Sequence, residues 1–188
     1  MFLAILLHGN ITHLLVSFSQ INIFSQLRLG FTLEHYYGVS RYSLLYVLSG
    51  LGGNLLTAYF KSESLSVGSS TSLFGVFGAY VCYFLYNWHI LPPGRNLILI
   101  LYLFFVVISL ELPITLQSVD IVGHIGGFVV GVLLGFFLLP RSESSETWNY
   151  ILILNGIAVL SYFALIIWLL GNLEDLNCCY SCKLKYLS

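Results

Sequence analysis

Long apolar stretches alternate along the chain with short polar connections. A helix needs about 20 apolar residues to cross a bilayer, and about six stretches approach that length. We therefore predict an all-α fold, a polytopic membrane helical bundle whose spans occupy residues 13–31, 41–60, 70–90, 96–113, 121–139 and 149–171. The connections contain helix-breaking residues, most clearly Pro92, Pro93 and Gly94, because proline removes a backbone donor and clashes with the preceding turn.

The organisation predicted from this pattern is one membrane domain over residues 1–171, followed by a short cysteine-containing tail at 172–188. Three cysteines lie in that tail, and three alone make a poor zinc site. They would form a disulfide if the tail faces an oxidising compartment, or accept palmitate if it faces the cytosol. We expect no metal and no cofactor.

Composition agrees with a chain that is solvated mostly by lipid. Of its 188 residues, 58% are hydrophobic and only 8% are charged, against about 25% charged residues in soluble domains. The net charge of -1 provides no basic face for nucleic acid. We expect no cleavable signal peptide, because a basic n-region followed by an apolar stretch and a small-residue exit site is not visible. The expected surroundings are the lipid bilayer.

Orientation follows from the basic residues in the connections. Arginines gather on the side where the first span ends: Arg28, Arg41, Arg95 and Arg141. Because cytoplasmic connections carry the excess of Lys and Arg, that side is predicted to be cytosolic. The opposite side, here called side A, is then lumenal or extracellular.

Two polar residues stand at the side A ends of separate spans. Ser70 opens the third span, and His124 lies about one turn into the fifth. His13 and Ser17 lie one helical turn apart at the start of the first span. Because the odd-numbered spans run parallel, all four residues are expected at similar depth. Polar groups in hydrocarbon are costly unless they are paired, so these four are candidates for function.

Small residues predict how the third and fifth spans meet. Glycine recurs every four residues beside His124, at Gly123, Gly127, Gly131 and Gly135. The third span has its own small face, formed by Thr71, Gly75, Ala79 and Cys82. Such faces let two helices approach closely in lipid, which would bring Ser70 beside His124. The same faces are also explained by packing alone.

Serine becomes a strong nucleophile only when a base within about 3 Å takes its proton. His89 lies at the cytosolic end of the third span, so His124, near side A, is the candidate general base for Ser70. Donors for an oxyanion would come from the Ser70 backbone N–H, His13 and Ser17. Asp120 lies one turn before His124, but it is expected to cap that helix. A Ser-His dyad is the interpretation that we favour.

Five motifs in the same order resemble those of the rhomboid intramembrane serine proteases. They are HGNITHLL at residues 8–15, GFTLEHYYG at 30–38, GLGGNL at 50–55, GSST at 68–71 and DIVGHIGGFVVG at 120–131. The resemblance implies a rhomboid-like bundle that cuts single-span membrane proteins near the lumenal or exterior face, so transmembrane proteins are the expected partners.

The same resemblance implies individual roles. Ser70 would be the nucleophile, His124 the base and His13 an oxyanion-site histidine, while Phe74 would pack against the imidazole. Gly68 and Gly127 belong to the nucleophile and base motifs. The last span, 149–171, resembles the extra C-terminal helix of secretory-pathway members. The expected location is therefore the secretory pathway or the plasma membrane.

Three departures from the family pattern leave a second function open. Ser17 stands where the family usually has asparagine, Thr71 replaces a common glycine, and no counterpart of the first core helix is visible, so we expect an incomplete N-terminus. Loss of one oxyanion donor can cost roughly 10²–10³ in rate. The alternative to an active protease is a catalytically dead rhomboid-like protein that binds transmembrane clients.

Overall fold

The structure is a computed structural model that describes residues 25–60, 69–91, 93–111, 120–140 and 146–185. Regular structure in these ranges is helical, which confirms the predicted all-α class. The predicted site residues His13, Ser17 and Gly68 lie outside the described residues.

The first described segment is helical farther than predicted. A π-helical turn, η3 (Gln26–Gly30), leads into α3 (Phe31–Tyr37), whereas the first span was expected to end at residue 31. Leu33 and Tyr37 are both buried in the core, and this burial stabilises the additional turns. Gly38 then breaks the helix with φ of 83°, a conformation that side chains disfavour.

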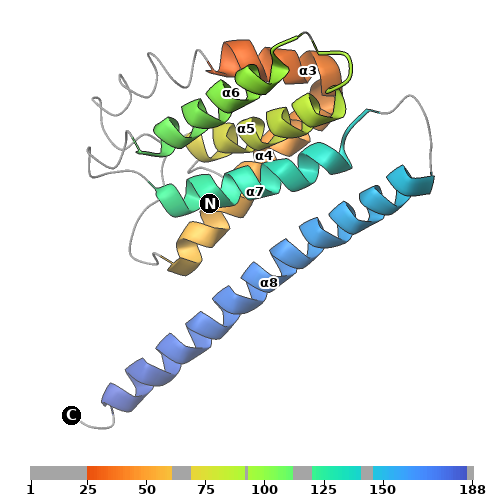
Figure 1. Cartoon of the computed structure of the whole chain (residues 1–188). Helices are drawn as coiled ribbons and strands as arrows, with labels where there is room; N and C mark the ends of the chain where they lie inside the picture. The colour runs from red at the N-terminus through yellow and green to blue at the C-terminus, as the bar shows by residue number, and fades with distance from the viewer. Residues whose placement is uncertain (1–24, 61–68, 92, 112–119, 141–145, 186–188) are drawn as a thin grey trace.

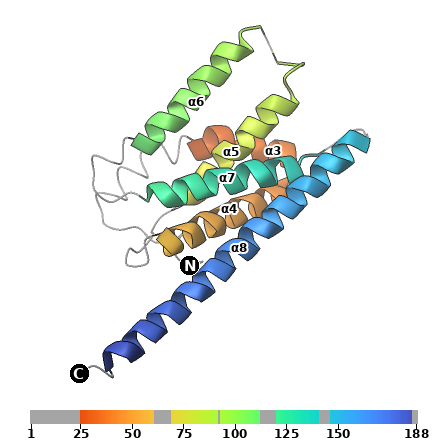
Figure 2. The same ribbon diagram turned by 60° about the horizontal axis from the view of Figure 1, so that its bottom comes forward.

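Three helices form the centre of the molecule: α4 (Val39–Phe60), α5 (Ser70–Tyr86) and α7 (Ile121–Phe137). Each packs against the other two, and both views of the ribbon show them together, with α6 and α8 outside them (Figures 1 and 2). Their shared core is apolar and includes Leu45, Phe77, Val130 and Leu134. The predicted spans at 41–60, 70–90 and 121–139 therefore correspond to the central helices.

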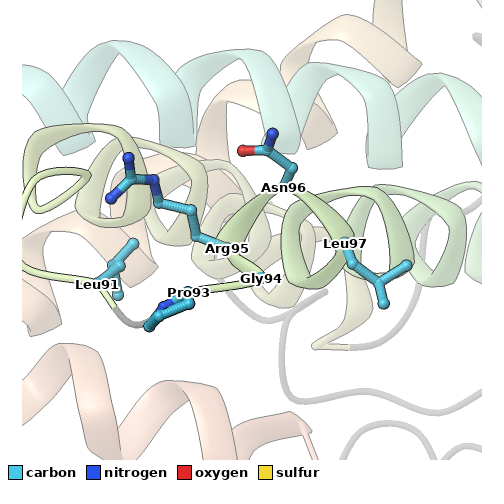
Figure 3. Close-up of a pocket in the computed structure, with 6 residues that line it drawn as sticks. All are labelled: Leu91, Pro93, Gly94, Arg95, Asn96 and Leu97. Atoms are coloured by element: carbon cyan, nitrogen blue, oxygen red, sulfur yellow. The ribbon is translucent and has the colours of Figure 1, made fainter.

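The connection between α5 and α6 (Arg95–Glu111) differs from the prediction that the third span reaches residue 90. Helix α5 ends at Tyr86, and beyond Asn87 the backbone continues in turns, with the Trp88 N–H donating to the Leu85 carbonyl at 3.3 Å. Figure 3 shows the start of α6, with Leu91, Pro93 and Gly94 before the helix and Arg95, Asn96 and Leu97 in its first turn. There the Arg95 guanidinium lies 5.0 Å from the Trp88 ring centre and donates to the Trp88 carbonyl at 3.1 Å.

Helix α6 contacts the central helices through few side chains. The Tyr102 hydroxyl donates a 2.7 Å hydrogen bond to the Phe77 carbonyl, and Phe105 packs edge-on against the Phe77 ring. The opposite face is apolar and exposed, as expected of a surface that meets lipid: Leu97, Ile98, Ile100, Leu101, Phe104 and Val107.

The last helix, α8 (Glu146–Lys185), is longer than the predicted span at 149–171. It continues through most of the predicted tail, because residues 172–185 contain no glycine or proline to end it. Helix α8 packs along α4 and α7, on the opposite side of the bundle from α6 (Figure 2).

Within the described ranges, two helical stretches have the length and hydropathy to cross a membrane, Val39–Phe60 and Trp148–Asn172. Shorter apolar helices cover Ser70–Tyr86, Arg95–Val107 and Ile121–Phe137. A helix of 17 residues is near the lower limit of about 17–25 for a span. The remaining predicted span, at 13–31, lies mostly outside the described residues.

Candidate active site

Ser70 and His124, the two candidate residues of the sequence analysis, lie side by side in the structure. Ser70 is the first residue of α5, and His124 is in the first turn of α7. The Ser70 Oγ and His124 Nε2 atoms are 2.8 Å apart, a hydrogen-bond distance. Ser70 is half-buried, whereas His124 is only 4% exposed. A hydroxyl reachable from the surface thus meets an imidazole held inside the bundle.

Close packing of α5 on α7 produces this approach. A Cβ atom on Gly127 would overlap the Thr71 carbonyl, and one on Gly131 would overlap the Gly75 backbone. A Cβ on Gly135 would lie 2.9 Å from the Ala79 Cα. The predicted small faces therefore do meet. Because the residue numbers of the contacting pairs rise together along both helices, α5 and α7 are parallel, as predicted.

Helix α4 completes the packing behind the pair. A Cβ on Gly53 would overlap both the Gly123 carbonyl of α7 and the Thr71 side chain of α5. A Cβ on Gly126 would lie 2.9 Å from the Gly53 Cα. Three backbones thus converge at His124, and only glycine permits that density.

Phe74 holds the plane of the imidazole. Its ring stacks on the His124 ring with centres 4.3 Å apart and an angle of 16° between the planes. Phe74 lies one helical turn after Ser70, so one face of α5 presents both the hydroxyl and the stacking ring. The contact expected from the family resemblance is present in the structure.

Asp120 caps α7, as predicted, and is bound on both of its oxygens. Its Oδ1 accepts a 3.0 Å hydrogen bond from the Gly123 backbone N–H. Its Oδ2 accepts a hydrogen bond from the buried Thr57 hydroxyl of α4. Asp120 therefore joins the start of α7 to the end of α4, which holds the turn that carries His124.

The start of α5 also provides electrostatic support. The first N–H groups of a helix have no partner within it and carry partial positive charge, and Ser70 is at this end of α5. A negative charge that develops beside Ser70 would be stabilised here.

Some supporting residues were missed by sequence reasoning. Thr57 follows Gly53 by four residues and shares its helix face, which was the available signal. Tyr162, whose hydroxyl donates a hydrogen bond to the Gly52 carbonyl of α4, carried no signal that separated it from the other tyrosines. Within the described part of the chain, no three His, Cys, Asp or Glu side chains gather where they would hold a metal.

Comparison with known proteins assigns the chain to a family. The rhomboid domain model matches residues 1–141, three quarters of the chain. The chain belongs to the rhomboid family. It is therefore an integral membrane protein, and the helical bundle described above is a rhomboid bundle.

Individual rhomboids match at moderate identity. RHOMBOID-like protein 2 of Arabidopsis thaliana is 43% identical over 137 residues, which are 73% of this chain and 41% of that protein. RHOMBOID-like protein 6, mitochondrial, of the same plant is 38% identical over 75% of this chain and 44% of its own length. Rhomboid-like protease 1 of Toxoplasma gondii is 36% identical over 149 residues, which are 78% of this chain and 49% of that protein. The match thus spans less than half of each of these relatives.

Proposed function

We propose that this rhomboid is an intramembrane serine endopeptidase that uses a Ser70–His124 dyad. The observation that carries the proposal is the 2.8 Å separation of Ser70 Oγ and His124 Nε2, since a base at this distance is what activates a serine. Similarity to proteins named as proteases, such as Rhomboid-like protease 1, supports the same reaction.

The reaction would begin with the Ser70 hydroxyl donating its hydrogen bond to His124 Nε2. As Oγ attacks a peptide carbonyl carbon, the imidazole takes the proton, and the carbonyl oxygen becomes an oxyanion. The C–N bond then breaks, and the imidazolium returns the proton to the leaving amine. Water attacks the acyl-serine by the same exchange, which releases the acid and restores Ser70.

Stabilisation of the oxyanion would come from donors near Ser70. The Ser70 backbone N–H at the start of α5 is one donor, and His13 and Ser17 remain the proposed side-chain donors. Phe74 and Asp120 would keep the imidazole oriented through each proton transfer, because one stacks on it and the other caps its helix.

The substrates proposed are single-span membrane proteins cut near the side A surface. Ser70 and His124 lie at the same end of the parallel helices α5 and α7, so the reacting atoms are near one membrane face. A substrate helix must unwind there, because its amides are otherwise hydrogen-bonded. We propose that this face is lumenal or extracellular, in the secretory pathway or at the plasma membrane.

The test is cleavage of a model single-span protein in liposomes by the wild-type chain and two serine variants. Ser70→Ala removes the nucleophile and should lower the rate by at least about 10³-fold. Ser72→Ala is the matched control, because Ser72 is a buried serine two residues along the same helix. The cleavage rate of Ser72→Ala should stay within about twofold of the wild-type rate.

Equal loss in both variants would attribute the effect to folding and contradict the dyad. A folded wild-type chain that cuts no model substrate would instead favour the alternative, a rhomboid-like protein that binds transmembrane clients without cleaving them.

A further inference from the structure

A tyrosine of α8 contacts the central bundle where α4 crosses α7. The Tyr162 hydroxyl donates a 3.1 Å hydrogen bond to the Gly52 carbonyl of α4. The same oxygen is 3.2 Å from the position that a Cβ on Gly126 of α7 would occupy. The phenol therefore touches both helices at once, and it fits because both lack side chains at this point.

The contact lies directly behind the candidate dyad. Gly126 follows His124 by two residues, and its backbone faces Gly53, where a Cβ on Gly126 would be 2.9 Å from the Gly53 Cα. Gly53 in turn packs against Thr71, the residue after Ser70. One continuous layer of backbone thus leads from Tyr162 through α4 to both members of the pair.

Other side chains of α8 also attach it to the bundle: Ile166 is buried, and the Trp148 ring packs edge-on against the Tyr86 ring. Most of its apolar stretch Trp148–Asn172 still faces away from the bundle, although Phe163 lies near Gly52 and Gly156 lies against Phe137. In an apolar environment a phenol hydroxyl needs a protein partner, so the bond to Gly52 is a strong constraint on where α8 lies. That constraint is applied at the level of His124.

We propose that Tyr162 is a positioning residue for the dyad: by holding α8 across α4 and α7, it sets the spacing between His124 and Ser70. The proposal rests on the proposed protease function. Tyr162 itself touches neither reacting atom. Loss of its hydroxyl bond would let α8 shift on α4 and α7, and a small shift of α7 would make the Ser70–His124 hydrogen bond longer and less populated.

The experiment compares Tyr162→Phe with Tyr37→Phe in the full chain, reconstituted in liposomes. Tyr37 is the matched control, because its hydroxyl donates a 2.9 Å hydrogen bond to the Gly135 carbonyl, near the other end of α7. Each variant loses one oxygen and one bond to a helix carbonyl. Readouts are kcat and KM for a model substrate, and the rate at which a fluorophosphonate modifies Ser70.

For Tyr162→Phe, kcat and the fluorophosphonate rate should fall about tenfold while KM changes by less than about twofold, since small misplacements of reacting groups mainly slow chemistry. Tyr37→Phe should stay within about twofold on all three measures. Equal effects of the two variants would overturn the positioning role and leave only a shared loss of stability.

A spectroscopic readout separates this proposal from the proposed function. With ¹⁵N-labelled histidine, the His124 ring resonances should move in Tyr162→Phe and stay in place in Tyr37→Phe, whether or not the chain cleaves anything. A wild-type chain that neither cleaves nor reacts with the fluorophosphonate would refute the protease proposal. Unmoved His124 resonances in Tyr162→Phe would refute the positioning role.

Discussion

At the scale of single residues, the candidate site is built around one imidazole. The Ser70 hydroxyl meets its edge, the Phe74 ring covers its face, and the turn that bears it is capped by Asp120. Each contact restricts a different motion. The hydrogen bond to Ser70 restricts rotation of the ring, the Phe74 ring restricts its tilt, and the Asp120 cap restricts fraying of the helix end. In the proposed reaction, an imidazole restrained in this way would exchange protons without reorganising, which would lower the cost of the transition state.

The Thr57–Asp120 hydrogen bond can be tested alone. Thr57→Val keeps the shape of the side chain but removes the donor to Asp120 Oδ2. A partly buried carboxylate that loses its donor should lower the free energy of unfolding by about 1–3 kcal/mol, measured by thermal unfolding in detergent. Thr57→Ser keeps the hydroxyl and should recover most of that loss. Equal losses in both variants would mean that the methyl group, and not the hydrogen bond, matters.

At the scale of helices, the molecule has two kinds of contact. Helices α4, α5 and α7 meet backbone to backbone through glycine, whereas α6 and α8 attach through a few large side chains and expose apolar faces. Dispersion between close backbones is the main attraction available between helices in lipid. The three central helices therefore form the rigid part on which the dyad is mounted.

Gly131→Ala tests that packing. The added methyl group would overlap the Gly75 backbone, which cannot rotate away. Helix α5 must then move off α7, and the free energy of unfolding should fall by about 1–3 kcal/mol, with a loss of cleavage. Thermal unfolding and a cleavage assay in liposomes measure the two effects.

Gly171→Ala is the matched control on α8, where an added Cβ would meet nothing within 4 Å. It should leave cleavage unchanged and stabilise the helix by up to about 1 kcal/mol. If Gly131→Ala were tolerated as well as Gly171→Ala, the α5–α7 contact would be looser than its geometry indicates.

At the scale of the whole molecule, the helices alternate in direction. Thr57, near the end of α4, meets Asp120 at the start of α7, while Tyr37, before α4, meets Gly135 near the end of α7. Helix α4 therefore runs antiparallel to α5 and α7. The dyad is at the end of the bundle opposite Arg41 and Arg95, which the positive-inside rule assigns to the cytosol.

The proposed orientation predicts where glycosylation can occur. An Asn-X-Thr acceptor inserted between α4 and α5, on the dyad side, should be glycosylated when the chain is synthesised with microsomes. The same acceptor inserted between α5 and α6 should stay unmodified, because that connection would face the cytosol in the proposed orientation. The reverse pattern would place the dyad on the cytosolic side, and no glycosylation at either place would contradict insertion into this membrane.

The sequence predicted where the central helices lie better than it predicted where each helix ends. The spans at 41–60, 70–90 and 121–139 were located to within a few residues, because apolar length is a local property. The extra turns of α3 were missed, since burial of Leu33 and Tyr37 in the tertiary core supports them. The early end of α5 at Tyr86 was also missed. The continuation of α8 to Lys185 was missed as well, although no breaker interrupts it.

The sequence alone determined that the chain is a helical membrane protein with a glycine ridge beside a histidine and a serine at the same depth. These features depend on composition and on spacing along one helix, both of which are local. Only the tertiary structure decided three contacts. They are the 2.8 Å distance between Ser70 Oγ and His124 Nε2, the Thr57 hydrogen bond to Asp120, and the position of the Tyr162 hydroxyl between Gly52 and Gly126. Each of these contacts joins residues of different helices, and their distances depend on how closely the backbones pack.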